Sequence, residues 1–306
     1  MRAVISGATG SIGRALIDEL LLRGDEILAL CRESSPRSKD IPSVSNIRKV
    51  DCPLDRMNEL ELDEKYDVFY HFAWEGTTGA SRNDMYLQNQ NVKHTLDAVA
   101  LASRLGCKTF IGAGSQAEYG RVEGKLTPET PAFPENGYGI AKLCASAMSR
   151  VMCESLGIRH IWARILSVYG PHDTATSMVM STVSKLANGE KPSFTKGEQI
   201  WDFLYSGDAA KAFVAIAEKG RDGAVYCLGS GDPAPLREYI KTIGRVIAPN
   251  APLGLGEVPY APRQVMYLCA DITALTNDTG FVPSTSFEEG IRRTYEWYLS
   301  RKKSSR

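Results

Sequence analysis

The sequence has no excess of charge of either sign, since its 306 residues include 36 Lys and Arg against 36 Asp and Glu. Such a chain has no overall field that would attract nucleic acid or an anionic membrane surface. It also lacks any apolar run of about eighteen residues, the length that a membrane-spanning helix needs. We therefore expect a globular protein with no nucleic-acid and no membrane partner, in which any anion binds at a local site.

Cysteine and histidine are few, and neither forms a metal-binding pattern. The seven cysteines contain no CxxC pair and the four histidines contain no HExxH motif, so no metal site is indicated. An odd number of scattered cysteines without an export signal is typical of reduced, mostly buried thiols. The expected location is cytoplasmic.

Short apolar runs alternate with amphipathic stretches along the first two thirds of the chain. This order predicts parallel βαβ units and hence an α/β fold with a doubly wound parallel sheet. The expected strands are 3–5, 26–31, 46–50, 66–73, 108–114 and 158–166, and the expected helices are 11–23, 86–105 and 138–156.

The pattern loosens beyond Pro171, where Pro and Gly become dense between residues 229 and 262. We expect a dinucleotide-binding domain over 1–170, to which part of 200–230 returns, and a smaller substrate-binding lobe over 171–306. The expected elements of this second part are helices 177–188, 207–218, 235–247 and 287–300 and a strand at 200–205.

Three glycines lie between the first expected strand and helix, in the stretch "GATGSIG". Gly7 would form a tight bend, Gly10 would let the backbone approach a pyrophosphate, and Gly13 would let the helix pack close to its strand. The spacing is GxxGxxG, and a purely structural turn is the alternative. As a dinucleotide site, the turn would bind the cofactor through Gly7, Thr9, Gly10, Ser11, Ile12 and Gly13.

A second pattern places a phenol and an ammonium four residues apart, at Tyr138 and Lys142 in "YGIAK". Residues with this spacing share one helix face. Ser115 follows a buried strand, at the sheet edge where open α/β sheets bind ligands. The three suit proton transfer coupled to hydride transfer: Ser115 holds the substrate oxygen, Tyr138 exchanges the proton, and Lys142 lowers the pKa of the phenol.

Further motifs extend along the chain, namely "HFAW" (71–74), "NVKHTLDA" (91–98), "ARILSVYGP" (163–171) and "IWDFLYSGDAAKA" (200–212). With "GATGSIG" and "YGIAK", they make the sequence resemble the extended short-chain dehydrogenase/reductase family, a group of nucleotide-sugar epimerases, dehydratases and reductases. The resemblance covers nearly the whole chain. It implies a Rossmann-type sheet with a smaller C-terminal lobe that binds a nucleoside-diphosphate sugar.

The resemblance also implies a cofactor site and a homodimer that pairs through the helices near 86–105 and 138–156. The implied cofactor contacts beyond the glycine turn are Asp51 and Cys52 near the adenine, Ala73 and Trp74 beside the cofactor, Asn91 at the start of its helix, and Tyr138 and Lys142 at the nicotinamide ribose.

Two departures from the family pattern narrow the chemistry. Dehydratases of the family follow the catalytic hydroxyl with an Asp-Glu pair, whereas Gln116 and Ala117 stand there. An amide and a methyl group cannot act as general acid and base, so a 4,6-dehydratase is not expected.

The second departure concerns the cofactor: the family's NAD-binding Asp is replaced by Cys31, which is followed by Arg32. An Arg would bind a 2′-phosphate, so we expect NADP(H) to be preferred, with Arg32 as the main contact and NAD(H) as the alternative. The competing interpretation of residues 32–39 is a solvated polar loop.

The substrate side also departs from the family, since Ser167 and Trp201 replace an Asn and an Arg that bind the diphosphate. Arg263 still matches a phosphate-binding Arg, and Gln116 is the fourth expected substrate contact. Trp201 either stacks on a base or sugar, or packs in the core.

The leading hypothesis is NADPH-dependent reduction of a nucleoside-diphosphate 4-keto-6-deoxy sugar. An NAD-dependent nucleotide-sugar 4-epimerase is the second enzyme hypothesis. A dinucleotide-binding sensor or scaffold is the alternative without catalysis, because fold does not fix function.

Overall fold

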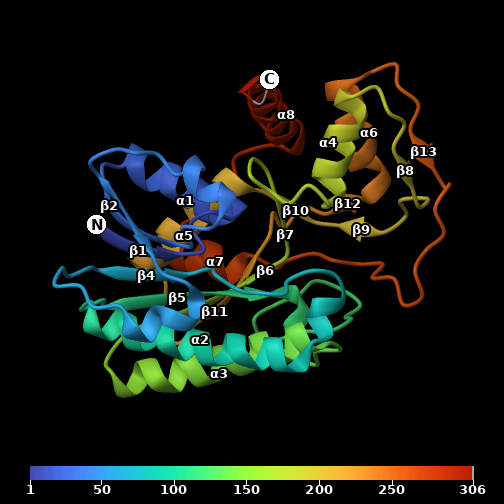
Figure 1. Cartoon of the computed structure of the whole chain (residues 1–306). Coiled ribbons are helices and arrows are strands. Elements are labelled where there is room, and N and C mark those ends of the chain that lie inside the picture. Colours follow the sequence, from blue (N-terminus) through green and yellow to red (C-terminus); the bar gives the residue numbers. More distant parts are fainter. Residues whose placement is uncertain (305–306) are drawn as a thin grey trace.

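A seven-stranded parallel sheet forms the centre of the computed structural model, which describes residues 1–304 (Figure 1). Its strand order is β11-β6-β5-β4-β1-β2-β3, so the chain starts in the middle and winds first to one edge and then to the other. This confirms the predicted doubly wound α/β fold. The strands are β1 (Arg2–Ser6), β2 (Glu26–Cys31), β3 (Ile47–Asp51), β4 (Val68–His71), β5 (Thr109–Ser115), β6 (Arg159–Ile165) and β11 (Val225–Leu228).

Helices cover both faces of the sheet, which is why its central strands are buried and mostly apolar. Helices α1 (Ser11–Leu22), α5 (Ser206–Lys219) and α7 (Thr273–Thr279) pack on one face, with residues such as Leu16, Phe213 and Leu275 in the core. Helices α2 (Met85–Arg104) and α3 (Gly137–Ser155) lie side by side on the other face (Figure 1). Short 3₁₀ helices lie in connections: η1 (Pro36–Asp40), η2 (Leu54–Glu59), η3 (Gly79–Asn83) and η4 (Gln116–Glu118).

A smaller group of elements lies beyond the carboxyl ends of the strands (Figure 1). Its core joins α4 (Met178–Ala187), α6 (Leu236–Ile247) and α8 (Phe287–Ser304) around Tyr169. Three two-stranded sheets complete it, made by β7 (Ser167–Tyr169) with β10 (Phe203–Tyr205), β9 (Ile200–Trp201) with β12 (Ala234–Pro235), and β8 (Ser193–Phe194) with β13 (Gly254–Leu255). The division of the chain into two domains near residue 170 stays a prediction.

The strand expected over 200–205 is interrupted at Asp202, and the reason is a buried carboxylate. The side chain of Asp202 is fully buried and accepts hydrogen bonds from the backbone N–H groups of Ser230 (2.6 Å) and Ala270 (3.0 Å). Because these partners come from two distant loops, sequence periodicity could not reveal the break. Asp202 therefore separates β9 from β10 and fixes the loops beside them.

Candidate active site

The glycine turn joins β1 to α1, and two of its glycines are required by close packing. Gly7 has φ of +76°, and a Cβ there would lie 2.6 Å from the backbone nitrogen of Ala73. A Cβ on Gly13 would lie 2.3 Å from the carbonyl oxygen of Gly7, so α1 approaches the turn closely. Gly10 is the N-cap of α1, with no side chain bonded to the first N–H groups. These groups are the ones that bind anions at a helix N-terminus.

Two cavities meet at this turn and share Gly7, Gly10, Phe72, Trp74 and Thr77. The first, of about 300 Å³, extends toward the ends of β2 and β3, and the second, of about 410 Å³, extends toward β5 and α3. Together they form one elongated cleft at the carboxyl edge of the sheet. A cleft with a backbone cradle at its middle has the form that a dinucleotide needs, so the residues present fit this cofactor.

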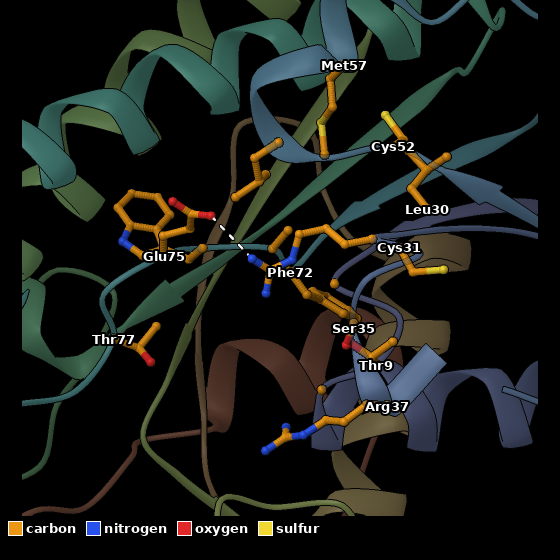
Figure 2. Close-up of a pocket in the computed structure, with 16 residues that line it drawn as sticks. Thr9, Leu30, Cys31, Ser35, Arg37, Cys52, Met57, Phe72, Glu75 and Thr77 are labelled. Atoms are coloured by element: carbon orange, nitrogen blue, oxygen red, sulfur yellow. Dashed lines mark ion pairs between the residues drawn. The ribbon is translucent and has the colours of Figure 1, made fainter. Parts of the chain in front are cut away.

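The first cavity is lined by two arginines that follow β2 in the chain, Arg32 directly after the strand and Arg37 in η1 (Figure 2). The guanidinium of Arg32 lies 3.8 Å from the carboxylate of Glu75, and the dashed line in Figure 2 marks this ion pair. Arg37 lines the same cavity, on the side of Thr9 in Figure 2. Cys31 and Cys52 also line it, so a thiol stands at the end of β2.

Asp51 and Asn91 hold backbone next to the first cavity and do not line either cavity. The carboxylate of Asp51 accepts a hydrogen bond from the N–H of Glu33 (2.7 Å). The buried amide of Asn91 accepts from the N–H of Glu75 and donates to its carbonyl oxygen, both at 2.9 Å. These two residues therefore support the loops that carry Arg32 and Trp74, while Ala73 and Trp74 line the cavity themselves.

Ser115, Tyr138 and Lys142 all line the second cavity, as do Ser11 and Ile12 of α1. Ser115 is the last residue of β5, and the two others lie one turn apart on α3. Burial raises the pKa of Tyr138, and a hydrogen bond with the Ser115 hydroxyl lowers it. The structure thus brings the three residues together at one wall of the cleft.

Lys142 is buried in an aromatic environment. Its Nζ donates to the carbonyl oxygen of Ala113 (2.6 Å) and lies 3.7 Å from the centre of the Trp74 ring. The indole nitrogen of Trp74 is itself held by Gln88 (2.9 Å). Burial lowers the pKa of Lys142 to about 7, because a buried ammonium loses hydration. The aromatic face and the carbonyl replace part of that hydration.

Glu118 is a supporting residue that the sequence analysis missed. Its fully buried carboxylate accepts hydrogen bonds from the N–H of Ser115 (2.8 Å), from Trp162 (3.0 Å) and from Arg164 (2.7 Å). Ser115 and Glu118 form a capping box, with the Ser115 side chain accepting from the N–H of Ala117. The Ser-x-x-Glu spacing after a buried strand could have revealed this arrangement.

A third cavity of about 410 Å³ shares Leu166, Val168 and Asp173 with the second and contains the altered substrate residues. The indole nitrogen of Trp201 donates to the hydroxyl of Ser167 (2.9 Å), so the two replacements form a pair. Trp201 also packs against a buried cluster, and its ring both lines the cavity and contacts the core. Gln199 lines this cavity with a buried Oε1 that has no hydrogen-bond partner among the described residues.

The other expected substrate residues lie outside these walls. Gln116 is a half-buried residue of η4, and Arg263 is exposed in a loop with φ of +63°. The positive charge of Arg263, after that of Arg121, contributes to lowering the pKa of Glu135. Within residues 1–304, no group of three or more His, Cys, Asp or Glu side chains could hold a metal ion, and no helix is long and apolar enough to cross a membrane.

Comparison with characterised proteins gives relatives of low identity. A dTDP-glucose 4,6-dehydratase of Xanthomonas campestris is 25% identical over 62% of this chain, and the chain spans 58% of that protein's length. One from Haemophilus influenzae is 23% identical over 100% of both chains. A dTDP-6-deoxy-L-talose 4-dehydrogenase (NAD(+)) of Aggregatibacter actinomycetemcomitans is 27% identical over 79% of this chain and 88% of its own.

Solved structures share the fold. A UDP-glucose 4-epimerase of Thermotoga maritima with UDP-glucose superimposes with a TM-score of 0.87 at 21% identity, covering 99% of this chain and 100% of its own. RMD from Pseudomonas aeruginosa complexed with NADPH gives 0.80 at 20% identity, covering 98% and 99%. The model of the NAD dependent epimerase/dehydratase family matches residues 3–229, which span most of the chain. The chain therefore belongs to the NAD dependent epimerase/dehydratase family.

Proposed function

We propose that this enzyme reduces the keto group of a nucleoside-diphosphate 4-keto-6-deoxy sugar with NADPH. The observation that carries the proposal is the gathering of Ser115, Tyr138 and Lys142 on one wall of a cleft that continues to the glycine turn. A carbonyl group at this wall would have a hydroxyl, a phenol and an ammonium beside it. These are the groups that a carbonyl reduction needs.

Each of the three residues has a role in this proposal. Ser115 donates a hydrogen bond to the carbonyl oxygen and so orients it. The nicotinamide, when bound, supplies the hydride to the carbonyl carbon. Tyr138 gives its proton to the oxygen, and the ammonium of Lys142 stabilises the phenolate that remains. The reduction ends with an alcohol, an oxidised cofactor and a phenolate that solvent reprotonates.

The residues after Ser115 argue against dehydration. Gln116 and Ala117 carry no titratable group, and the carboxylate of the next residue, Glu118, already accepts three hydrogen bonds. A carboxylate held in this way is not free to remove a proton from substrate. The proposed activity is therefore redox chemistry at C4 alone.

Charge at the first cavity supports the preference for NADPH. Arg32 and Arg37 line this cavity, while the carboxylate of Asp51 accepts a hydrogen bond from the backbone N–H of Glu33. Arginine binds phosphate through charge-assisted, two-pronged hydrogen bonds. The proposed contacts of the 2′-phosphate are Arg32 first and Arg37 second, and the ion pair of Arg32 with Glu75 would open when the phosphate binds.

The test is a panel of dTDP-, UDP- and GDP-linked 4-keto-6-deoxy sugars incubated with NADPH, in which loss of NADPH absorbance is measured and the product sugar is identified. We expect one nucleotide series to oxidise NADPH at a rate proportional to enzyme. The 4-epimerase alternative predicts instead that the purified protein retains NAD and interconverts two sugar nucleotides without added cofactor. That result would overturn the proposal.

A further inference from the structure

Arg82 lies against the ring of Tyr138, and nothing in the sequence patterns assigned it a role. Its guanidinium carbon is 4.4 Å from the centre of the phenol ring. Arg82 belongs to η3, between β4 and α2, and donates a hydrogen bond to the carbonyl oxygen of Thr77 (3.2 Å). Thr77 lines both cavities of the cleft.

Packing between η3 and the start of α3 holds Arg82 at this position. The side chain of Asn83 accepts a hydrogen bond from the N–H of Gly137 (3.0 Å), the first residue of α3. A Cβ on Gly137 would lie 3.0 Å from the carbonyl oxygen of Arg82 and 2.8 Å from the sulfur of Met85. Because glycine at 137 lets η3 come this close, Arg82 is fixed beside the residue that follows, Tyr138.

The other groups that face Tyr138 do not supply a permanent positive charge. Burial raises the pKa of Tyr138, Ser115 and Arg82 lower it, and the carboxylate of Glu118 raises it. The Nζ of Lys142 is 5.9 Å from the ring centre, and its own pKa is lowered by burial to about 7. A guanidinium stays charged throughout the range in which enzymes work. The ring of Trp74 also packs against the Tyr138 ring, at 84° to it and with 6.0 Å between the ring centres.

We propose that Arg82 is a positioning residue that stabilises the phenolate form of Tyr138 and thereby sets the pH at which this residue exchanges its proton. Negative charge in a phenolate extends over the ring, so a cation above the ring is attracted more strongly to the phenolate than to the phenol. In carbonyl reduction, the hydride joins the carbon, the Tyr138 proton joins the oxygen, and the phenolate is left beneath Arg82. The catalytic consequence rests on the function proposed above.

The first test needs no substrate. The protein is labelled with ¹³C at tyrosine Cζ, the Tyr138 signal is assigned by its loss in Tyr138→Phe, and its titration is followed up to about pH 11. We expect Arg82→Gln to raise the midpoint of the Tyr138 titration by about 1 pH unit, or to move it above the highest pH measured. Arg82→Lys should raise the midpoint by less than half as much. The control Arg221→Gln removes an exposed arginine that pairs with Asp278 and should leave the midpoint unchanged. An equal midpoint in Arg82→Gln and wild type, or a wild-type signal that does not titrate, would overturn the proposal.

The second test separates this proposal from the proposed function. With a 4-keto sugar substrate, the alkaline limb of reduction and the acid limb of alcohol oxidation should both move to higher pH in Arg82→Gln. A merely structural role would lower both rates without moving either limb. A shifted Tyr138 titration without any 4-keto sugar turnover would overturn the reductase function and leave the role of Arg82 intact. Turnover with unmoved limbs would overturn the role of Arg82.

Discussion

At the scale of single residues, the site holds a charge in a place that is unfavourable for folding. Lys142 is buried against Trp74, and its pKa is lowered to about 7, well below that of a lysine in the unfolded chain. A group whose pKa is lower in the folded state opposes folding most strongly below that pKa. The opposition fades as pH rises toward about 10, where the unfolded lysine is also neutral.

We therefore expect Lys142→Met to stabilise the protein without cofactor, by about 2 kcal/mol at pH 7, while it abolishes turnover. Most of this difference in the free energy of unfolding between variant and wild type should disappear at about pH 10. Urea unfolding of both proteins at pH 7 and pH 10 measures the difference. A variant that is less stable than wild type at pH 7, or a gain that does not depend on pH, would contradict this account of Lys142.

We propose that cofactor preference depends on a single side chain, Arg32. Arg32→Ala should weaken NADPH binding by about 10- to 100-fold and leave NADH binding within about twofold, because only the 2′-phosphate contact is lost. Titration calorimetry with both cofactors measures this, with Arg245→Ala, an exposed arginine of α6 paired with Glu288, as the control. An equal loss of affinity for NADPH and NADH would show that Arg32 does not bind the 2′-phosphate.

At the scale of elements, α2 and α3 carry apolar side chains that stay exposed in the part of the chain that the structure describes. Ile140, Met148 and Val151 lie on the outer side of α3, and Tyr86 at the start of α2 is 88% exposed. Isolated exposed apolar side chains are ordinary, but a stripe at helical spacing is typical of a surface that another helix covers. We propose that a second copy of the chain covers it, so that four helices pack together in a homodimer.

Met148→Glu should convert this dimer to a monomer, since a carboxylate would be buried among apolar groups. Light scattering at micromolar concentration measures the mass, and Arg150→Glu, an exposed substitution on another side of α3, should remain dimeric. A monomeric wild-type protein would refute the proposed dimer.

Local patterns were sufficient to predict most of these elements, and long-range contacts explain the rest. The helices α2 and α3 follow the apolar periodicity to within a residue or two at each end. The break at Asp202 and the hydrogen bonds of Glu118 to Trp162 and Arg164 depend on side chains that meet only after folding. The four-residue spacing of Tyr138 and Lys142 was sufficient to predict that they share one helix face. The contact of Arg82 with Tyr138 could not be predicted, because it depends on the packing of η3 against α3.

At the scale of the whole molecule, the sheet buries histidines that resist protonation. His71 lies between Ser6 and Thr95, and burial lowers its pKa to about 3. His160 bonds to Ser149, and burial lowers its pKa to about 4. Both are charged in the unfolded chain below about pH 6.5, so folding becomes less favourable as pH falls from there toward these values.

We expect the free energy of unfolding to fall by about 2 kcal/mol per buried histidine between pH 7.5 and pH 5. His160→Gln should lose less stability over this range than wild type, whatever its stability at pH 7.5. Thermal unfolding in matched buffers measures both. An unchanged pH dependence in His160→Gln would exclude this histidine as a cause.

The central proposal is that a sugar carbonyl is reduced in the cleft. It receives a hydride from the cofactor bound at the glycine turn and a proton from Tyr138 at the edge of the sheet. The most direct test is NADPH oxidation by wild type and Tyr138→Phe with the 4-keto-6-deoxy sugar that the panel selects, together with NADPH affinity. We expect turnover in the wild type, a loss of at least about 100-fold in Tyr138→Phe, and equal NADPH binding by both. Undiminished turnover in Tyr138→Phe would contradict it.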